Sequence, residues 1–167
     1  IGTGSRGITC IGRQIAEQAS ELDITITAFC NRTESRMHVA LEDVNRIAAA
    51  AGNGAFSPAF YSDPLALISD DNVDTIVITT PTAAHREAAI PALRSGKKVY
   101  LDKPIAHTVE DAVAIWEEEH RANNPMIMGF TRRYEQPWIE LYDLLQSGVI
   151  GELKMMLIRA VIPYTHY

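Results

Sequence analysis

Three glycines at the start of the sequence constrain its fold more than any other feature. Gly2, Gly4 and Gly7 form the pattern G-x-G-x-x-G, and an amphipathic helix is predicted directly afterwards, over residues 6–20. In a dinucleotide-binding turn the first glycine allows the tight turn, the second lets the backbone approach a pyrophosphate, and the third allows close helix packing. A glycine-rich turn without a ligand is the alternative. The helix that follows, and a strand predicted to end near Cys30, favour dinucleotide binding.

Further along, short β-branched segments alternate with longer segments of helical periodicity, which is typical of βα units on a parallel sheet. The predicted fold class is therefore α/β, with a Rossmann-type doubly wound parallel sheet. The predicted strands are residues 24–29, 59–61, 73–79, 98–101 and 126–130. The predicted helices are residues 35–51, 82–95 and 108–116, and Pro91 is expected to kink or split the second of these. Thr108, with Asp111 three residues later, forms a capping-box-like start for the third.

A strand has to precede the first glycine of this motif, and only Ile1 is available for it. In the strand order 3-2-1-4-5-6, that strand is central and lies between residues 24–29 and residues 73–79. We therefore expect Ile1 to be the last residue of a first strand that is otherwise missing from the sequence. Unpaired buried backbone groups cost about 1–3 kcal/mol each, so the literal chain should fold poorly.

The alternating pattern changes after the strand predicted at residues 126–130. We expect a dinucleotide-binding domain over residues 1–131, and a domain join with the first strand of a second domain over residues 132–167. The second part contains a predicted helix, residues 136–146, and a long predicted strand, residues 152–162. We interpret it as the start of an α+β domain with an antiparallel sheet.

Charge and composition exclude several function classes. A net charge of -6 argues against binding to nucleic acid, which needs a basic surface. No apolar run is long enough to span a bilayer, and no metal-ligand spacing is present. The two cysteines, Cys10 and Cys30, do not form a disulfide framework, which fits free thiols in the cytoplasm. The expected partner is a small molecule.

The choice of cofactor is usually made where the second strand of such a fold ends. An acidic side chain there binds the ribose 2′-hydroxyl of NAD, but this sequence has Asn31 followed by Arg32. No carboxylate would repel a 2′-phosphate, and a guanidinium could bind it, so we expect NADP. The alternative is that Arg32 stacks on the adenine and that NAD is used.

Two further groups of polar residues follow predicted strands directly. Thr80, Pro81 and His85 come after residues 73–79, and Asp102 and Lys103 come after residues 98–101. Ligands of open α/β sheets bind outside the carboxyl ends of the strands, so these residues are expected to face the cofactor. The predicted cofactor-binding residues are Gly2, Gly4, Ser5, Arg6, Gly7, Asn31, Arg32, Thr80, Pro81, His85, Asp102 and Lys103.

Four motifs in this order carry a family resemblance: G-T-G-S-R-G, T-P-T-A-A-H, K-K-V-Y-L-D-K-P and G-F-T-R-R-Y. The sequence resembles the glucose-fructose oxidoreductase, inositol dehydrogenase and rhizopine-catabolism (Gfo/Idh/MocA) family over essentially its whole length. The resemblance implies hydride transfer between a nicotinamide and a sugar or cyclitol carbon. It makes Lys103 the catalytic residue, in contact with cofactor and substrate, and it suggests a cis peptide between Lys103 and Pro104. Asp102 replaces the glutamate of the family's E-K-P motif.

The resemblance places the usual acid-base histidine in the second domain, beyond this sequence. Arg132 could contact the substrate, and a packing role at the domain join is an equal alternative. A homo-oligomer formed through the second domain is expected. Two other functions remain open: a non-catalytic NADP-binding sensor of the same fold, and nicotinamide-dependent elimination or glycoside cleavage.

Overall fold

The computed structural model describes residues 1–159, and the chain divides into two compact units. The first is Ile1–Gly129, and the second begins at Phe130. Each unit is treated by itself below. No helix among the described residues is long and apolar enough to cross a membrane.

The first unit is built on five short parallel strands in two groups. Strand β1 pairs with β2, and the other three strands pair in the order β3-β4-β5. Their bounds are β1 Ala28–Cys30, β2 Ala59–Tyr61, β3 Thr75–Ile78, β4 Lys98–Leu101 and β5 Met126–Met128. Every pair is parallel, which confirms the predicted α/β class. The β-branched and aromatic content of these segments suits strands that are covered on both faces.

Ile1 and Gly2 lie between β1 and β3, which do not pair directly with each other. The amino group of Ile1 donates to the carbonyl of Val77 at 2.7 Å, and the carbonyl of Ile1 accepts from the amide of Thr79 at 2.9 Å. On the other side, the Gly2 amide donates to the carbonyl of Cys30 at 2.9 Å. The predicted central place of Ile1 in the strand order is therefore confirmed.

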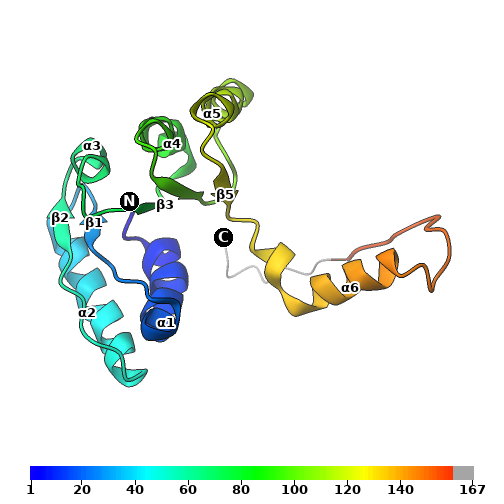
Figure 1. Cartoon of the computed structure of the whole chain (residues 1–167), viewed down its shortest axis with the longest axis horizontal. Helices are drawn as coiled ribbons and strands as arrows, with labels where there is room; N and C mark the ends of the chain where they lie inside the picture. Colours follow the sequence, from blue (N-terminus) through cyan, green and yellow to red (C-terminus); the bar gives the residue numbers. More distant parts are fainter. Residues whose placement is uncertain (160–167) are drawn as a thin grey trace. The chain divides into compact units, whose positions relative to one another are not determined.

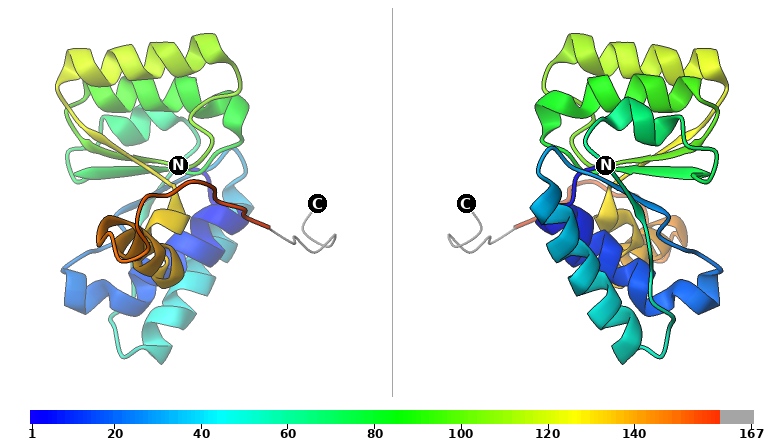
Figure 2. Two further views of the ribbon diagram at one scale, coloured as in Figure 1. Left: turned by 90° about the vertical axis from the view of Figure 1, so that its right-hand side faces the viewer. Right: turned by 90° about the vertical axis from the view of Figure 1, so that its left-hand side faces the viewer.

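Helices cover both faces of the strands, as a doubly wound sheet requires. On one side lie a π-helix, Arg6–Gly12, that leads into α1, Arg13–Leu22, and the long helix α2, Glu34–Ala50. On the other side lie α3, Pro64–Ile68, α4, His85–Arg94, and α5, Val109–Ala122. Figure 2 shows the two layers clearly, with α4 and α5 on the opposite side of the strands from α1 and α2.

Each face has its own hydrophobic core. On the α4 side, Ile76, Ile78 and Leu101 pack against a row of small α4 residues that includes Ala89 and Ala92. On the α2 side the buried residues are Ile8, Ala16, Ala19, Phe29, Met37, Ala40, Val44, Ala48 and Phe56. Full burial of one large aliphatic side chain stabilises the fold by about 1.5–3 kcal/mol relative to its exposed state.

Several predicted boundaries differ from the structure. The predicted strand over residues 24–29 is wrong in its first half, because β2 offers three residues for pairing and residues 24–26 have no neighbouring strand to bond. The predicted helix over residues 82–95 begins with a 3₁₀ turn. Helix α4, labelled in Figure 1, includes Pro91 and is not split there. Helix α5 extends further than predicted, to Ala122, and Thr108 caps it by accepting from the amide of Asp111, as the sequence indicates.

The second unit starts with a 3₁₀ turn, Thr131–Tyr134, followed by α6, Gln136–Gln146. Helix α6 confirms the prediction for residues 136–146. The predicted strand over residues 152–162 is wrong for residues 152–159, which have no strand structure, and its last residues lie outside the described range. A strand requires a hydrogen-bonded neighbour, and no described segment pairs with residues 152–159.

Candidate functional site

The three glycines of the first loop occupy very different environments. At Gly2, where φ is +95°, an added Cβ would lie 2.9 Å from backbone atoms of Thr79 and Thr80. At Gly7 it would lie 2.2 Å from the Gly2 carbonyl oxygen, whereas at Gly4 it would meet nothing within 4 Å. The chain's own packing thus requires the first and third glycines. The second faces open space, where a ligand can approach the backbone.

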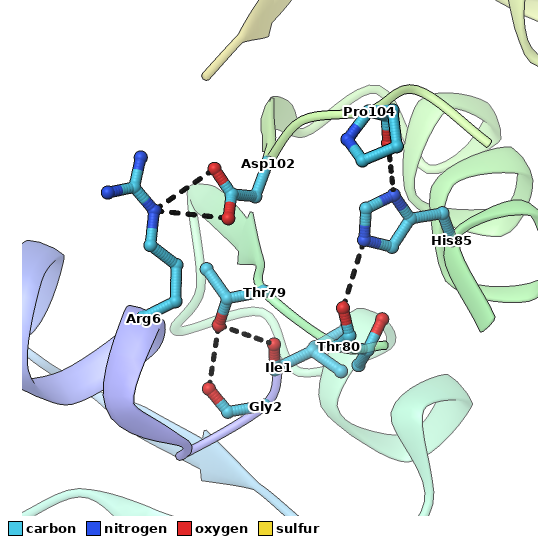
Figure 3. Close-up of polar contacts among 8 residues, drawn as sticks. All are labelled: Ile1, Gly2, Arg6, Thr79, Thr80, His85, Asp102 and Pro104. Atoms are coloured by element: carbon cyan, nitrogen blue, oxygen red, sulfur yellow. Dashed lines mark hydrogen bonds and ion pairs between the residues drawn. The ribbon is translucent and has the colours of Figure 1, made fainter. Parts of the chain in front are cut away.

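Thr79, the residue after β3, ties this loop to the sheet. Its Oγ1 hydroxyl donates to the carbonyl of Gly2 at 2.7 Å (Figure 3), and its amide holds the carbonyl of Ile1. The glycine loop and the carboxyl end of β3 are therefore joined directly. The polar residues Thr80 and Pro81 follow at once.

An ion pair joins the glycine loop to the carboxyl end of β4. Nε of Arg6 lies 3.1 Å from both carboxylate oxygens of Asp102 (Figure 3). Burial opposes the charge of Arg6, but the nearby Asp102 carboxylate and its hydrogen bonds raise the pKa of the guanidinium above its ordinary value. Gly129 makes room for this carboxylate, because a Cβ there would lie 2.7 Å from Oδ1 of Asp102.

His85, the first residue of α4, is buried with 1% of its surface exposed. Its Nδ1 lies 2.9 Å from the carbonyl oxygen of Pro104, and its Nε2 lies 3.0 Å from the carbonyl oxygen of Thr80. Figure 3 shows the ring standing between these two loops. Because both ring nitrogens face backbone carbonyls, neither is free for a cofactor. The structure gives His85 a different role from the cofactor contact predicted from the sequence.

Lys103 lies on the loop that follows β4 and is exposed. Its peptide bond to Pro104 is cis, which confirms the expectation from the family resemblance. Within residues 1–159 its ammonium group makes no hydrogen bond and no ion pair. The charge of Lys103 is therefore available to a ligand.

Asn31 is occupied by the chain itself. Its Nδ2 donates to Oγ1 of Thr3 in the glycine loop at 2.8 Å, and its Oδ1 accepts from the amide of Thr33 at 3.0 Å. The neighbouring Arg32 is exposed, and no described residue pairs with it. A cavity of about 430 Å³ lies next to this region, and its lining residues are Thr3, Gly4, Ser5, Ile8, Thr9, Ser35, Arg36, Val39, Ala40 and Asp43.

Two buried polar atoms in this region have no partner among the described residues: Nη2 of Arg6 and Oγ1 of Thr80. Buried polar groups are almost always hydrogen-bonded, so unpaired ones at a loop cluster favour a ligand that completes them. A dinucleotide fits these groups, since its phosphates are anionic and its ribose and carboxamide groups can donate hydrogen bonds. Among residues 1–159, no three His, Cys, Asp or Glu residues are grouped as metal ligands.

Sequence reasoning missed three contributors to this arrangement: Thr79, Gly129 and the pairing of Arg6 with Asp102. The signal for Gly129 was present, because a glycine directly after β5 occupies the same place on its strand as Asp102 on β4. Arg132 belongs to the second unit, where its guanidinium lies 3.3 Å from the carboxylate of Glu135. A role for Arg132 in substrate binding stays a prediction.

Comparison with known proteins decides the family. Residues 1–130 match the family model described as an oxidoreductase family with an NAD-binding Rossmann fold. The chain belongs to the Gfo/Idh/MocA family of oxidoreductases. The predicted membership is thus confirmed, and this region is a nicotinamide dinucleotide-binding domain.

Several inositol dehydrogenases are similar over much of the chain. Inositol 2-dehydrogenase 2 of Saccharopolyspora erythraea is 36% identical over 115 residues, which is 68% of this chain and 34% of that protein. Inositol 2-dehydrogenase of Salmonella typhimurium is 30% identical over 158 residues, or 92% of this chain and 44% of that protein. The structure of myo-inositol dehydrogenase from Lactobacillus casei, in complex with NAD(H) and myo-inositol, is 25% identical with a TM-score of 0.73.

That structural alignment covers 90% of this chain and 41% of the Lactobacillus casei chain. This Gfo/Idh/MocA member therefore spans between 34% and 44% of the length of these relatives.

Proposed function

We propose that this chain forms the nucleotide-binding part of an NAD(P)-dependent dehydrogenase that acts on a hydroxyl group of a sugar or cyclitol. The observation that carries the proposal is the exposed Lys103, which has no partner among the described residues. The Arg6–Asp102 ion pair joins its loop to the glycine loop. The names of the similar proteins, inositol 2-dehydrogenases, support the substrate class.

The bound nicotinamide would supply a hydride acceptor, and the chain's residues would bind and orient it. The backbone amides that follow Gly4 begin a helix, which favours an anionic diphosphate. The unpaired groups of Arg6 and Thr80 add hydrogen-bonding capacity beside them. Lys103 would donate a hydrogen bond to the carbinol oxygen and stabilise the negative charge that develops there as the carbinol proton passes to the acid-base histidine that the family resemblance places in the second domain.

We also propose that NADP is preferred over NAD. Residues 31–33 contain no carboxylate, and the exposed guanidinium of Arg32 has no partner among the described residues. Arg36 and Ser35 line the neighbouring cavity together with Thr3 and Gly4. Guanidinium and hydroxyl groups are suited to a 2′-phosphate. The Lactobacillus casei enzyme, which is 25% identical to this chain, is in complex with NAD(H) in its structure.

For the cellular setting, we propose the cytoplasm, since Cys10 and Cys30 are free thiols in the structure. We also propose that the protein forms a homo-oligomer. Size-exclusion chromatography with light scattering of the protein as its gene encodes it would measure the oligomeric state, and a monomer would contradict this part.

The decisive test is whether the protein, as its gene encodes it, turns over a substrate. NAD⁺ or NADP⁺ is supplied with a panel of cyclitols and sugars that includes myo-inositol, and reduced nicotinamide is followed by absorbance. We expect Lys103→Ala to lower turnover at least about 100-fold, the lower range for loss of a positioned proton-transfer group. Lys98→Ala, an exposed lysine at the other end of β4, is the matched control and should be unchanged.

Near-normal turnover of Lys103→Ala would refute the assignment of that lysine. Tight cofactor binding by the unaltered protein without turnover of any substrate would favour the sensor. Product formation without net reduction of the cofactor would favour elimination or glycoside cleavage.

A further inference from the structure

The loop that carries Lys103 is held from both sides. Before Lys103, the amide of Asp102 donates to the carbonyl of Ile78 at 3.0 Å, and the carboxylate of Asp102 bonds to Arg6. After Lys103, the carbonyl of Pro104 lies 2.9 Å from Nδ1 of His85. The position of the lysine backbone is therefore fixed by two contacts before it and by the contact of Pro104 with His85 after it.

His85 makes the second of these contacts from an unusual position. Its two ring nitrogens face carbonyl oxygens on two different loops, Thr80 after β3 and Pro104 after β4 (Figure 3). A third carbonyl, that of Ile105, lies 3.3 Å from Nδ1. Carbonyl oxygens only accept hydrogen bonds, so each ring nitrogen can bond to its carbonyl only while that nitrogen carries a proton. No side chain in the described residues competes for either nitrogen.

The two ring nitrogens also contact different loops. Nδ1 lies next to a carbonyl of the Lys103 loop, whereas Nε2 lies next to a carbonyl of the loop of Thr80 and Pro81. The ring is 1% exposed, and each of its nitrogens lies within hydrogen-bond distance of a backbone carbonyl, so it has little freedom to turn. A rigid donor of this kind can set the position of a carbonyl next to an otherwise unpaired lysine.

We propose that His85 is a positioning residue for the proposed dehydrogenase reaction: through Nδ1 and the carbonyl of Pro104 it holds Lys103 in the geometry needed to donate to the carbinol oxygen. This rests on the proposed function. His85 itself touches neither substrate nor cofactor. The inference separates the two nitrogens, because only the Nδ1 contact bears on Lys103.

Two substitutions test this separation. The side-chain amide nitrogen of asparagine can take the place of Nδ1, whereas that of glutamine can take the place of Nε2. His85→Asn should therefore keep the contact with Pro104, and His85→Gln should keep only the contact with Thr80. His85→Ala removes both. The matched control is His120→Ala, because His120 is an exposed histidine whose Nδ1 also faces a carbonyl, that of Trp116 in its own helix, and none of its hydrogen bonds among the described residues reaches residues 102–107.

The measurements are kcat and KM of the protein as its gene encodes it, and the dissociation constant of NADPH by fluorescence titration. A misplacement of about 1 Å can cost about 100-fold in rate, so kcat of His85→Ala should fall about 10–100-fold. NADPH affinity should stay within about threefold. His85→Asn should recover more of kcat than His85→Gln, and His120→Ala should match the unaltered protein.

Equal kcat values for His85→Asn and His85→Gln, or a higher value for His85→Gln, would overturn the proposal. So would a loss of kcat matched by an equal loss of NADPH affinity. If His85→Ala does not fold, as judged by circular dichroism, the comparison of His85→Asn with His85→Gln decides alone.

A second readout separates this inference from the proposed function. Amide hydrogen exchange of peptides covering residues 102–107 should be slowest in the unaltered protein, intermediate in His85→Asn and faster in His85→Gln. If the unaltered protein turns over no substrate but shows this order, the proposed function fails and the loop contact stands. If exchange does not follow this order, the positioning role is wrong whatever the activity.

Discussion

Replacing Gly7 and Gly4 with alanine should separate the two tasks of the glycine loop. A Cβ at Gly7 would lie 2.2 Å from the carbonyl oxygen of Gly2 and 2.6 Å from Oγ1 of Thr79. Ordinary contact begins at 3.4 Å, so the helix start and the loop would have to separate by more than 1 Å. That carbonyl is also the acceptor for Thr79, so the movement would break the hydrogen bond that ties the loop to β3. At Gly4 a Cβ meets no atom within 4 Å.

The size of the effect follows from two opposing contributions. Overpacking costs about 1–3 kcal/mol, and a separation this large belongs at the upper end, about 3 kcal/mol. Alanine is favoured over glycine inside a helix by about 1 kcal/mol, which offsets part of the cost. Gly7→Ala should therefore lower the free energy of unfolding by about 2 kcal/mol. For a unit of this size, that corresponds to a fall in Tm of about 8 °C.

The assay is thermal unfolding by circular dichroism, together with titration of the cofactor, in the protein as its gene encodes it. Gly4→Ala should keep its Tm within about 1 °C. It should nevertheless weaken cofactor binding at least about tenfold, because its Cβ enters the space through which a diphosphate reaches the backbone. An unchanged Tm for Gly7→Ala, or unchanged affinity for Gly4→Ala, would refute the reasoning.

Three other substitutions test single contacts. Arg32→Ala should weaken NADP binding about 10–100-fold, the range for a charge-assisted hydrogen bond, and leave NAD binding unchanged. Calorimetric titration measures both affinities, and a variant that still prefers NADP would contradict the cofactor proposal. Asp102→Asn should lower the free energy of unfolding by about 1.5–3 kcal/mol in urea titrations, because it removes the anion that pairs with Arg6, and an equal midpoint would speak against that pair. Hydrogen bonding by Arg94 lowers the pKa of Glu118 below its ordinary value of 4.5, so the ionised Glu118 stabilises the fold above pH 4.5 and this stabilisation is lost as the pH falls through the lowered pKa. Glu118→Gln should therefore lose less stability in acid than the unaltered protein, and parallel curves of unfolding free energy against pH would show that this pair does not govern acid unfolding.

The sequence by itself determined the class of fold and the place of the site. The glycine spacing, the alternation of β-branched and amphipathic segments, and polar residues directly after strands all report on conformations set within a few residues. For the same reason the cap at Thr108 and the helix Gln136–Gln146 could be predicted closely. Strand lengths could not, because pairing depends on the neighbouring strand: residues 24–26 and 152–159 have strand-like sequences but no described partner.

Only the tertiary structure decided which side chains work together. Arg6 and Asp102 are 96 positions apart in the sequence, and His85 and Pro104 are 19 apart, so no local pattern relates them. A parallel sheet brings the loops after its strands to one edge, but it does not specify which polar group bonds to which. That choice follows from distance and burial: His85, predicted to face a ligand, turns inward to two carbonyls, and Lys103 is exposed with no hydrogen bond or ion pair among residues 1–159.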